Sequence, residues 1–253
     1  MSVLTRLGSV SMCFPESRLK TYARRIGYRL MRGLRSSSRT ITFNNVTLKM
    51  YDYPLLGGTG FEEPALSGYI KHRDVQPGDI VVDVGAYAGD FTIYAAIKAG
   101  PSGKVIAFEP DSNSHAMLCE NIRLNSLSNV TILKKGLWSE DGELSITGTA
   151  FASQLSPDSI KYPTRVQVCS LDNELKRLAI NRVDFIKVDI EGAEMDALKG
   201  MSHTMESKPY LAIASYHLKD GARTSTLLEP ILRGKGYRVA TENPVHLTTF
   251  GLR

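Results

Sequence analysis

The chain of 253 residues contains only three cysteines, Cys13, Cys119 and Cys169, and none lies in a Cys-x-x-Cys pair or at a metal-ligand spacing from a histidine. This odd, scattered set argues against a disulfide framework and is typical of a reducing compartment. The sequence also lacks an apolar run near the ~20 residues needed to span a bilayer. Arg6 and nearby Ser and Gly residues interrupt every candidate secretory signal. We therefore expect a cytoplasmic protein that is soluble or peripheral to a membrane.

Acidic residues are scarce in residues 1–40, which hold nine of the 31 Lys and Arg residues but only one acid, Glu16. Between Leu19 and Leu34 apolar residues recur at helical spacing, with arginines on the opposite face. Three interpretations stay open: the apolar stripe packs on the following domain, residues 17–36 contact an anionic membrane surface, or the segment is a cleaved transit peptide. We expect residues 1–40 to be a basic extension and residues 41–253 to be one domain.

Short apolar runs alternate with helical segments through the core of that domain, about residues 60–220. The runs predicted as core strands are 80–84, 104–108, 130–133, 183–188 and 210–215. The segments predicted as helices are 64–70, 91–98, 112–124, 171–178, 193–200 and 223–234. A hairpin at 41–52, added strands at 143–147 and 166–169, and a C-terminal hairpin at about 236–250 complete the pattern. It predicts an α/β fold with a mostly parallel, doubly wound sheet, to which the C-terminal hairpin adds an antiparallel edge strand.

The segment VVDVGAYAGDFT, residues 81–92, predicts a buried strand, a turn of small residues and then a helix. In open α/β sheets this first turn is where nucleotide-like ligands bind. Gly85 and Gly89 are expected to let a ligand approach the backbone, and the helix N-terminus offers N–H groups to a carboxylate. Asp83, just before the turn, is suited to hold an ammonium group or to order water near it.

A second carboxylate, Glu109, follows Gly89 by twenty residues at the end of the next strand. In this position it can accept hydrogen bonds from both hydroxyls of a ribose. Tyr87 stands where a dinucleotide fingerprint requires glycine, so a pyrophosphate is disfavoured, whereas the amino-acid tail of S-adenosylmethionine is tolerated. We therefore predict S-adenosylmethionine as the cofactor. The expected cofactor-binding residues are Asp83, Gly85, Ala86, Tyr87, Gly89, Phe91, Thr92, Glu109, Pro110 and Asp189.

A second polar motif, VDFIKVDIEGAEMDALKGM, occupies residues 183–201. Strand alternation places Lys187 and Asp189 on the same side, and we expect the lysine to pair with this aspartate and keep it ionised. Glu191 and Glu194 are spaced to share one helix face, although acids are also favourable at any helix N-terminus.

The motifs IKVDIEGAE at 186–194, DVGAYAG at 83–89 and FEP at 108–110 resemble those of the FkbM family of S-adenosylmethionine-dependent methyltransferases. The resemblance covers about residues 60–220. It implies a class I methyltransferase fold and, from characterised relatives, O-methylation of sugar or polyketide-type hydroxyls. Two positions depart from the family pattern: Tyr87 replaces the usual Asn, and Ser215-Tyr216-His217 replaces an acid, an apolar residue and His.

A hydroxyl acceptor of this kind is a poor acid, so removing its proton during transfer would contribute about 10²–10⁴-fold to the rate. The expected catalytic residues are Asp189, Glu191, His217 and Lys187, with His217 or the two acids as the general base. No metal is predicted as the first choice, although Asp189, Glu191 and Glu194 are an alternative set of ligands for a divalent cation.

The sequence thus predicts an S-adenosylmethionine-dependent O-methyltransferase that acts on a small molecule, or on a hydroxyl of a glycan, glycolipid or secondary metabolite. Two alternatives stay open: an RNA methyltransferase, and a non-catalytic cofactor-binding or scaffold domain. A nucleic-acid partner is not favoured, because the basic residues concentrate in residues 1–40 and no basic platform rich in aromatic residues follows.

Overall fold

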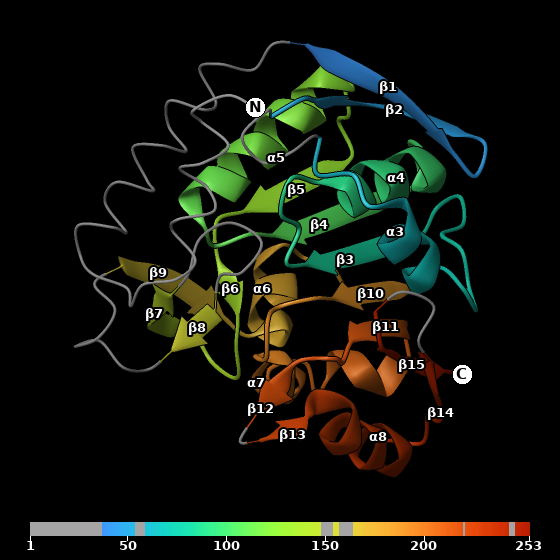
Figure 1. Cartoon of the computed structure of the whole chain (residues 1–253). Helices are drawn as coiled ribbons and strands as arrows, with labels where there is room; N and C mark the ends of the chain where they lie inside the picture. Colours follow the sequence, from blue (N-terminus) through green and yellow to red (C-terminus); the bar gives the residue numbers. More distant parts are fainter. Residues whose placement is uncertain (1–36, 54–58, 148–153, 157–163, 220, 243–245) are drawn as a thin grey trace.

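The computed structural model describes residues 37–53, 59–147, 154–156, 164–219, 221–242 and 246–253 (Figure 1). A seven-stranded sheet with the order β14-β15-β11-β10-β3-β4-β5 forms its centre. The predicted α/β fold with a mostly parallel sheet is confirmed. The strands are β3 (Ile80–Val84), β4 (Lys104–Phe108), β5 (Val130–Leu133), β10 (Phe185–Val188), β11 (Tyr210–Ala214), β14 (Arg238–Glu242) and β15 (Thr248–Leu252).

The C-terminal hairpin is present, but its antiparallel strand is not the edge strand that we expected. β15 is antiparallel to both β11 and β14 and lies between them. β14 therefore forms the edge and runs parallel to the core strands. The sequence pattern marks a hairpin but not which of its strands pairs with the sheet, because side-chain alternation reports which face of a strand is buried and not which strand is its neighbour.

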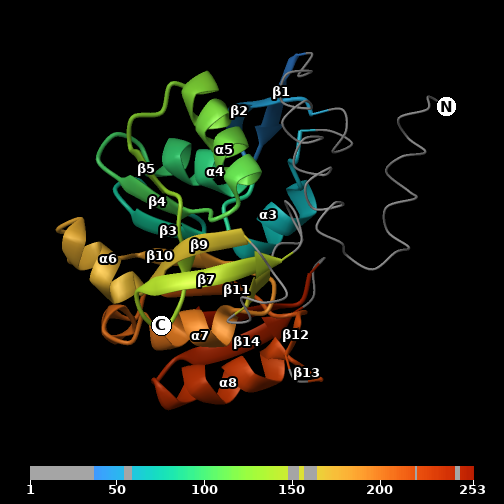
Figure 2. The same ribbon diagram turned by 90° about the vertical axis from the view of Figure 1, so that its left-hand side faces the viewer.

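Helices cover both faces of the sheet (Figures 1 and 2). One face carries α3 (Glu63–Tyr69), α4 (Asp90–Ala99) and α5 (Ser112–Leu124), and the other carries α6 (Leu171–Arg177), α7 (Glu194–Lys199) and α8 (Thr224–Gly234). Strand alternation separates the two cores: Phe185 packs in the first, whereas Ile186 and Val188 pack in the second. Asp111 caps α5 by accepting the N–H groups of Asn113 and Ser114.

The N-terminal hairpin consists of β1 (Ser38–Phe43) and β2 (Val46–Tyr51). Asn44 and Asn45 form its turn with φ values of 47° and 61°, a left-handed backbone that asparagine tolerates. The side chain of Asn121 on α5 accepts the N–H of Tyr51 at 2.9 Å and so ties the hairpin to the helical layer. Smaller elements are β6 (Gly136–Leu137), β7 (Gly142–Thr147), β8 (Gln154–Ser156), β9 (Thr164–Cys169), η4 (Thr204–Ser207), β12 (Leu218–Lys219) and β13 (Ala222–Arg223).

The predicted basic extension, with its amphipathic helix and the proposed membrane contact of residues 17–36, lies outside the described residues. The described chain enters the fold at β1, slightly before the expected boundary at residue 41. Within the described part of the chain, no helix has the length and apolar character required to cross a membrane.

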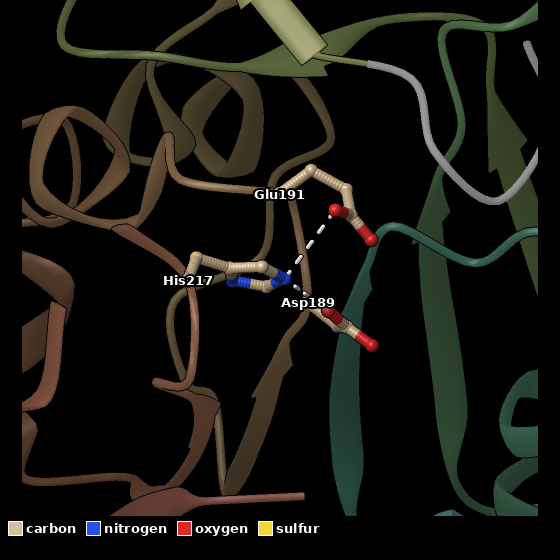
Figure 3. A group of neighbouring side chains, drawn as sticks. All are labelled: Asp189, Glu191 and His217. Atoms are coloured by element: carbon tan, nitrogen blue, oxygen red, sulfur yellow. Dashed lines mark ion pairs between the residues drawn. The ribbon is translucent and has the colours of Figure 1, made fainter. Parts of the chain in front are cut away.

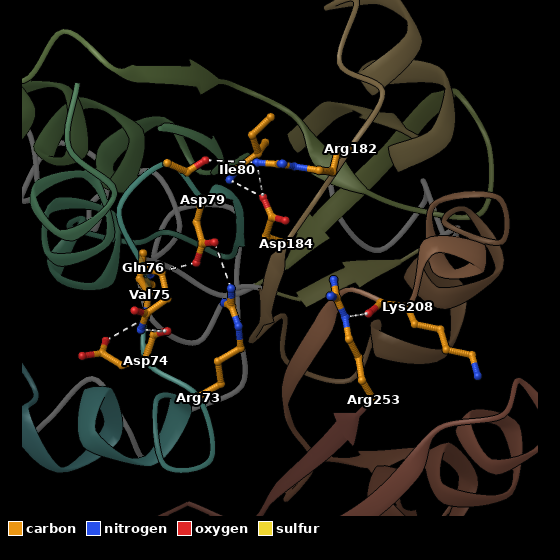
Figure 4. Close-up of polar contacts among 11 residues, drawn as sticks. Arg73, Asp74, Val75, Gln76, Asp79, Ile80, Arg182, Asp184, Lys208 and Arg253 are labelled. Carbon is orange, nitrogen blue, oxygen red and sulfur yellow. Dashed lines mark hydrogen bonds and ion pairs between the residues drawn. The ribbon is translucent and has the colours of Figure 1, made fainter. Parts of the chain in front are cut away.

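Charged side chains fix the starts of β3 and β10, at the sheet edge opposite the strands' carboxyl ends (Figure 4). Asp79 accepts hydrogen bonds from Arg73 at 2.9 Å and from the Gln76 N–H at 2.8 Å. Asp184 accepts the N–H of Ile80 at 2.8 Å and so joins the start of β10 to the start of β3. These contacts position the two strands whose far ends carry the polar motifs.

Candidate active site

A cavity of about 470 Å³ opens at the carboxyl ends of β3, β4 and β10. Its wall includes residues of α3, the β3–α4 turn, the end of β4, the β10–α7 turn and Tyr216. The volume falls within the ~300–1,000 Å³ range of small-molecule sites, and the place is where open α/β sheets bind ligands.

The two glycines of the β3–α4 turn allow close packing within the protein, a role that was not predicted from the sequence. A Cβ at Gly85 would lie 1.9 Å from the carbonyl oxygen of Asp189, and one at Gly89 would lie 2.5 Å from Leu118. Both residues also have positive φ, 78° and 95°. The glycines therefore let the turn approach the end of β10 and helix α5. Gly85 also lines the cavity, whereas Gly89 lies behind it.

Glu109 lies at the cavity wall, where it accepts backbone N–H groups from Tyr87 at 2.9 Å and from Asp111 at 2.8 Å. Burial raises its pKa to about 8, against the opposing effect of these two hydrogen bonds. Each carboxylate oxygen has two lone pairs, so each retains acceptor capacity after one N–H contact.

Asp83 does not line the cavity, although we expected it to contact the cofactor tail. It is fully buried beneath the turn, where it accepts the hydroxyl of Thr92 and pairs with Lys187 at 3.1 Å. The predicted pair of Lys187 with Asp189 is therefore wrong. The register of β10 against β3 places Lys187 directly across from Asp83, and its Nζ also donates to the Gly85 carbonyl at 2.7 Å.

The pKa of Lys187 depends on further acids besides its direct partner Asp83. Burial lowers the pKa of Lys187, but the charges of Asp83, Asp189 and Asp90 outweigh burial and raise it above its usual value. Lys187 therefore stays protonated and is an internal counter-charge for the acids around the turn.

Three side chains meet at the cavity edge, Asp189 and Glu191 from the β10–α7 turn and His217 from the segment after β11 (Figure 3). The Nε2 atom of His217 lies 3.5 Å from Glu191 Oε2 and 3.7 Å from Asp189 Oδ1. Both acids line the cavity, whereas His217 lies behind them and is only 7% exposed. The structure thus brings together three of the four residues that we expected to be catalytic.

Glu191 and Glu194 do not share a helix face, because α7 begins only at Glu194. Glu191 and Gly192 instead have positive φ, 55° and 100°, and this left-handed turn redirects the first acid. As a result, the two carboxylates approach opposite nitrogens of His217. Glu194 Oε1 lies 2.8 Å from Nδ1, off the direction required for a linear hydrogen bond, and also accepts the Gly192 N–H at 3.1 Å.

The acid cluster determines the charge of His217. Burial lowers the pKa of this imidazole, but the carboxylates of Glu191, Glu194 and Asp189 outweigh burial and raise it to about 10. At neutral pH in this structure, His217 therefore carries a proton as a counter-charge for the acids. Ser215, at the position where the family pattern has an acid, donates to the carbonyl of Leu247 at 3.1 Å. The acids around His217 come instead from the β10–α7 turn and from the start of α7.

Among the cavity residues that sequence reasoning missed are Tyr69, Asp90 and Tyr216. The hydroxyl of Tyr69 donates to Asp189 Oδ2 at 2.8 Å, but Tyr69 belongs to α3 and no motif marks it. Burial raises the pKa of Asp90 to about 6. The position of Asp90 directly after Gly89 was the available signal, because this is where a helix N-terminus meets the ligand site.

The expected cofactor-binding residues therefore divide into two groups. Those at the cavity wall are Gly85, Ala86, Tyr87, Phe91, Glu109, Pro110 and Asp189. Asp83, Gly89 and Thr92 lie behind the wall and support the turn.

Comparison with known proteins identifies the class. The methyltransferase FkbM domain matches residues 83–239, and this chain therefore belongs to the FkbM methyltransferase family. Methyltransferase 1 of Beauveria bassiana is 30% identical over 203 residues, covering 69% of this chain and 79% of that protein. The hexuronic acid methyltransferase AglP of Haloferax volcanii is 26% identical over 142 residues, covering 56% of this chain and 57% of that protein.

The fold is that of class I methyltransferases. Fibrillarin of Aeropyrum pernix, solved with natively bound S-adenosylmethionine, superposes with a TM-score of 0.51 at 11% identity and covers 86% of this chain and 84% of that chain. The protein is a methyltransferase that uses S-adenosylmethionine, as the sequence predicts.

The cavity has the charge expected for this cofactor. Its wall carries the acids Glu62, Asp90, Asp189 and Glu191, and also Glu109, which does not add to the charge because its pKa is raised to about 8. Its two lysines are already neutralised, Lys135 by Glu174 at 2.7 Å and Lys187 by Asp83 at 3.1 Å. An excess of acid suits a ligand with a sulfonium and an ammonium group, and Glu109 retains acceptor capacity for hydroxyls.

Proposed function

We propose that this protein transfers the methyl group of S-adenosylmethionine to a hydroxyl oxygen of a glycan, glycolipid or secondary metabolite. The observation that carries the proposal is the position of Asp189 and Glu191 in the wall of the same cavity as the β3–α4 turn and Glu109. The residues that we assign to the cofactor and the carboxylates that we assign to proton removal thus line one cavity.

Glu109 is the residue we assign to the ribose hydroxyls, and the turn of Gly85, Ala86 and Tyr87 to the amino-acid tail. When bound, the cofactor supplies an electrophilic methyl group on its sulfonium. Orienting the acceptor oxygen toward that methyl group is the main contribution of the cavity, for which up to ~7–11 kcal/mol is available.

The charge of the cavity favours a neutral acceptor. A carboxylate or phosphate acceptor would be repelled by Asp189 and Glu191, and the same repulsion disfavours a polyanionic nucleic acid. A sugar hydroxyl carries no charge and meets the carboxylates as a hydrogen-bond donor. The relative AglP is a hexuronic acid methyltransferase, which supports a carbohydrate as the class of acceptor. A hexuronic acid itself carries a carboxylate, so the charge of this cavity favours a neutral sugar over that particular acceptor.

Proton removal is assigned to the cluster of Asp189, Glu191 and His217. As the bond between oxygen and methyl forms and the bond between methyl and sulfur breaks, the hydroxyl proton passes to the carboxylate of Glu191. His217, protonated and buried behind this carboxylate, lies 3.5 Å from it as a counter-charge. Glu191 is thus the proposed general base, and His217 is its counter-charge.

The test is transfer of labelled methyl from the cofactor to a fractionated extract of the native cell. An ether-linked methyl group withstands alkali, whereas a methyl ester is hydrolysed, so alkaline treatment of the product distinguishes these two. Nuclear magnetic resonance of the alkali-stable product then identifies the atom that carries the methyl group. We expect alkali-stable label in a carbohydrate or metabolite fraction. Label that alkali releases, or label on nitrogen or carbon, would refute O-methylation of a hydroxyl.

Two variants carrying the same substitution test the role of Glu191. Glu191→Gln is expected to lower kcat by about 10²–10⁴-fold while the affinity for S-adenosylhomocysteine stays within about threefold. Glu206→Gln is the matched control, because its side chain is 73% exposed and lies outside the cavity wall. Equal kcat values for the two variants would remove Glu191 from the mechanism.

A further inference from the structure

We propose that Asp189, Glu191 and His217 bind a divalent cation at the wall of the cavity (Figure 3). One ligand atom from each side chain lies within 4.8 Å of the other two. The Nε2 atom of His217 is 3.5 Å from Glu191 Oε2 and 3.7 Å from Asp189 Oδ1. Ligand atoms bound ~2.1 Å from a metal at angles of ~90–110° are roughly 3.0–3.5 Å apart, so small side-chain movements complete the site.

The hydrogen bonding of His217 is the independent observation that points to a ligand. This side chain is 93% buried, since its exposed fraction is 7%. Its Nε2 faces the two carboxylates, yet it has no hydrogen-bond partner within the described chain, and neither does the buried Oδ1 of Asp189. Buried polar atoms are almost always satisfied, because an unsatisfied one costs ~1–3 kcal/mol. A cation between the three side chains satisfies both atoms at once.

Neighbouring residues hold the ligands in orientations suited to a metal. Glu194, which is fully buried, lies 2.8 Å from Nδ1 of His217 and so directs Nε2 toward the two acids. Histidine ligands of metals commonly have such a carboxylate behind them. The hydroxyl of Tyr69 donates to Oδ2 of Asp189, which leaves Oδ1 for the cation.

The donor set indicates the class of cation. Two carboxylates and one imidazole suit Mg²⁺ or Mn²⁺, which favour oxygen ligands and retain open positions for water or substrate. Three protein ligands leave such positions on the cavity side. The role of the cation rests on the proposed function: bound to the acceptor hydroxyl, it lowers the pKa of that hydroxyl, while Oε1 of Glu191 accepts the proton.

The direct test measures binding of Mn²⁺ to the full-length protein. The electron paramagnetic resonance signal of Mn²⁺ that remains free is the readout. We expect one saturable site in the unmodified protein. His217→Gln and Glu191→Gln are each expected to weaken Mn²⁺ binding at least about 10-fold. His203→Gln and Glu206→Gln are the matched controls, because this exposed His–Glu pair lies outside the cavity, and we expect both to bind as the parent does.

Several outcomes overturn the cation site. Absence of saturable Mn²⁺ binding to the parent protein does so, as does equal binding by His217→Gln and His203→Gln. Circular dichroism of every variant confirms folding, and Glu191→Gln provides an independent result if removal of the buried histidine unfolds the chain.

The same measurements separate this proposal from the proposed function. Alkali-stable methyl transfer that persists in EDTA, together with no Mn²⁺ site, refutes the cation and leaves O-methylation standing. A Mn²⁺ site lost in His217→Gln, together with transfer only to a non-hydroxyl group, supports the cation and refutes O-methylation.

Discussion

Replacing Lys187 by methionine tests whether this lysine supports the fold from within the site. Lys187 is 5% exposed, and its partner Asp83 is fully buried. The lysine Nζ lies 3.1 Å from Asp83 Oδ1 and donates to the Gly85 carbonyl at 2.7 Å. Methionine keeps most of the side-chain volume but removes the charge and both polar contacts.

The expected loss follows from the charge left behind. Breaking a buried ion pair by removing one partner costs ~3–5 kcal/mol, because the other partner stays charged without compensation. The same substitution also removes the hydrogen bond to the Gly85 carbonyl. Its free energy is not added to the ~3–5 kcal/mol, because contacts of one group are not additive. For a chain of this size, that loss corresponds to a melting temperature lower by roughly 6–20 °C.

Urea unfolding followed by far-UV circular dichroism measures the free energy of unfolding. Lys199→Met is the matched control, because Lys199 is 64% exposed in its 2.7 Å ion pair with Asp196. Exposed pairs contribute only ~0–1 kcal/mol, so this variant should unfold close to the parent.

A double variant isolates the interaction between the two charges. Asp83→Asn removes the uncompensated charge while its amide oxygen still accepts the Thr92 hydroxyl. We expect Lys187→Met with Asp83→Asn to recover most of the stability lost in Lys187→Met alone. A Lys187→Met protein within about 1 kcal/mol of the parent, or a double variant no more stable than the single one, would refute this reasoning.

Two further predictions concern Glu109 and Gly85. Because the pKa of Glu109 is raised to about 8 from a usual value of 4.5, the folded state retains a proton that the unfolded state has lost between these pH values, and stability falls as pH rises through that window. Urea unfolding at pH 5 and pH 8 measures this fall in the free energy of unfolding. The fall should be smaller for Glu109→Gln than for the parent, by up to ~1.4 kcal/mol per pH unit. Equal falls in the two proteins would contradict the raised pKa. Gly85→Ala places a Cβ 1.9 Å from the Asp189 carbonyl at a φ of 78°, whereas Gly100→Ala has a φ of 66° with nothing within 4 Å. Both variants are expected to lose ~1–2 kcal/mol from left-handed backbone strain. Thermal melts should show a larger loss of stability for Gly85→Ala than for Gly100→Ala, because only Gly85→Ala also meets the Asp189 carbonyl. Equal losses would show that this contact is relieved without cost.

The sequence predicts the elements well because burial controls the local pattern. The run at residues 104–108 and the helix at 112–124 match β4 and α5, since both faces of a parallel sheet are covered and its strands are continuously apolar. The aspartate before α5 caps it, a local interaction that depends only on neighbouring residues.

The contacts of the site depend instead on register and turn geometry. Lys187 and Asp189 are close in sequence and on one side, yet the pairing of β10 with β3 gives Lys187 to Asp83. Glu191 and Glu194 have helical spacing, but the left-handed backbone at Glu191 and Gly192 precedes the helix. Neither register nor that turn is encoded in residue spacing.

The arrangement around Asp189 explains why this motif needs two positive groups of different kinds. On one side the acid is influenced by the charge of Lys187, which is held permanently by Asp83. On the other side it faces Nε2 of His217, whose charge is exchangeable because an imidazole carries either a proton or a metal at that atom. Asp189 therefore lies between a fixed positive charge behind the turn and an exchangeable one at the cavity edge. Lys187 is thus part of the cavity wall, but its Nζ is held by Asp83 and by the Gly85 carbonyl, which makes it a counter-charge for the acids around the turn.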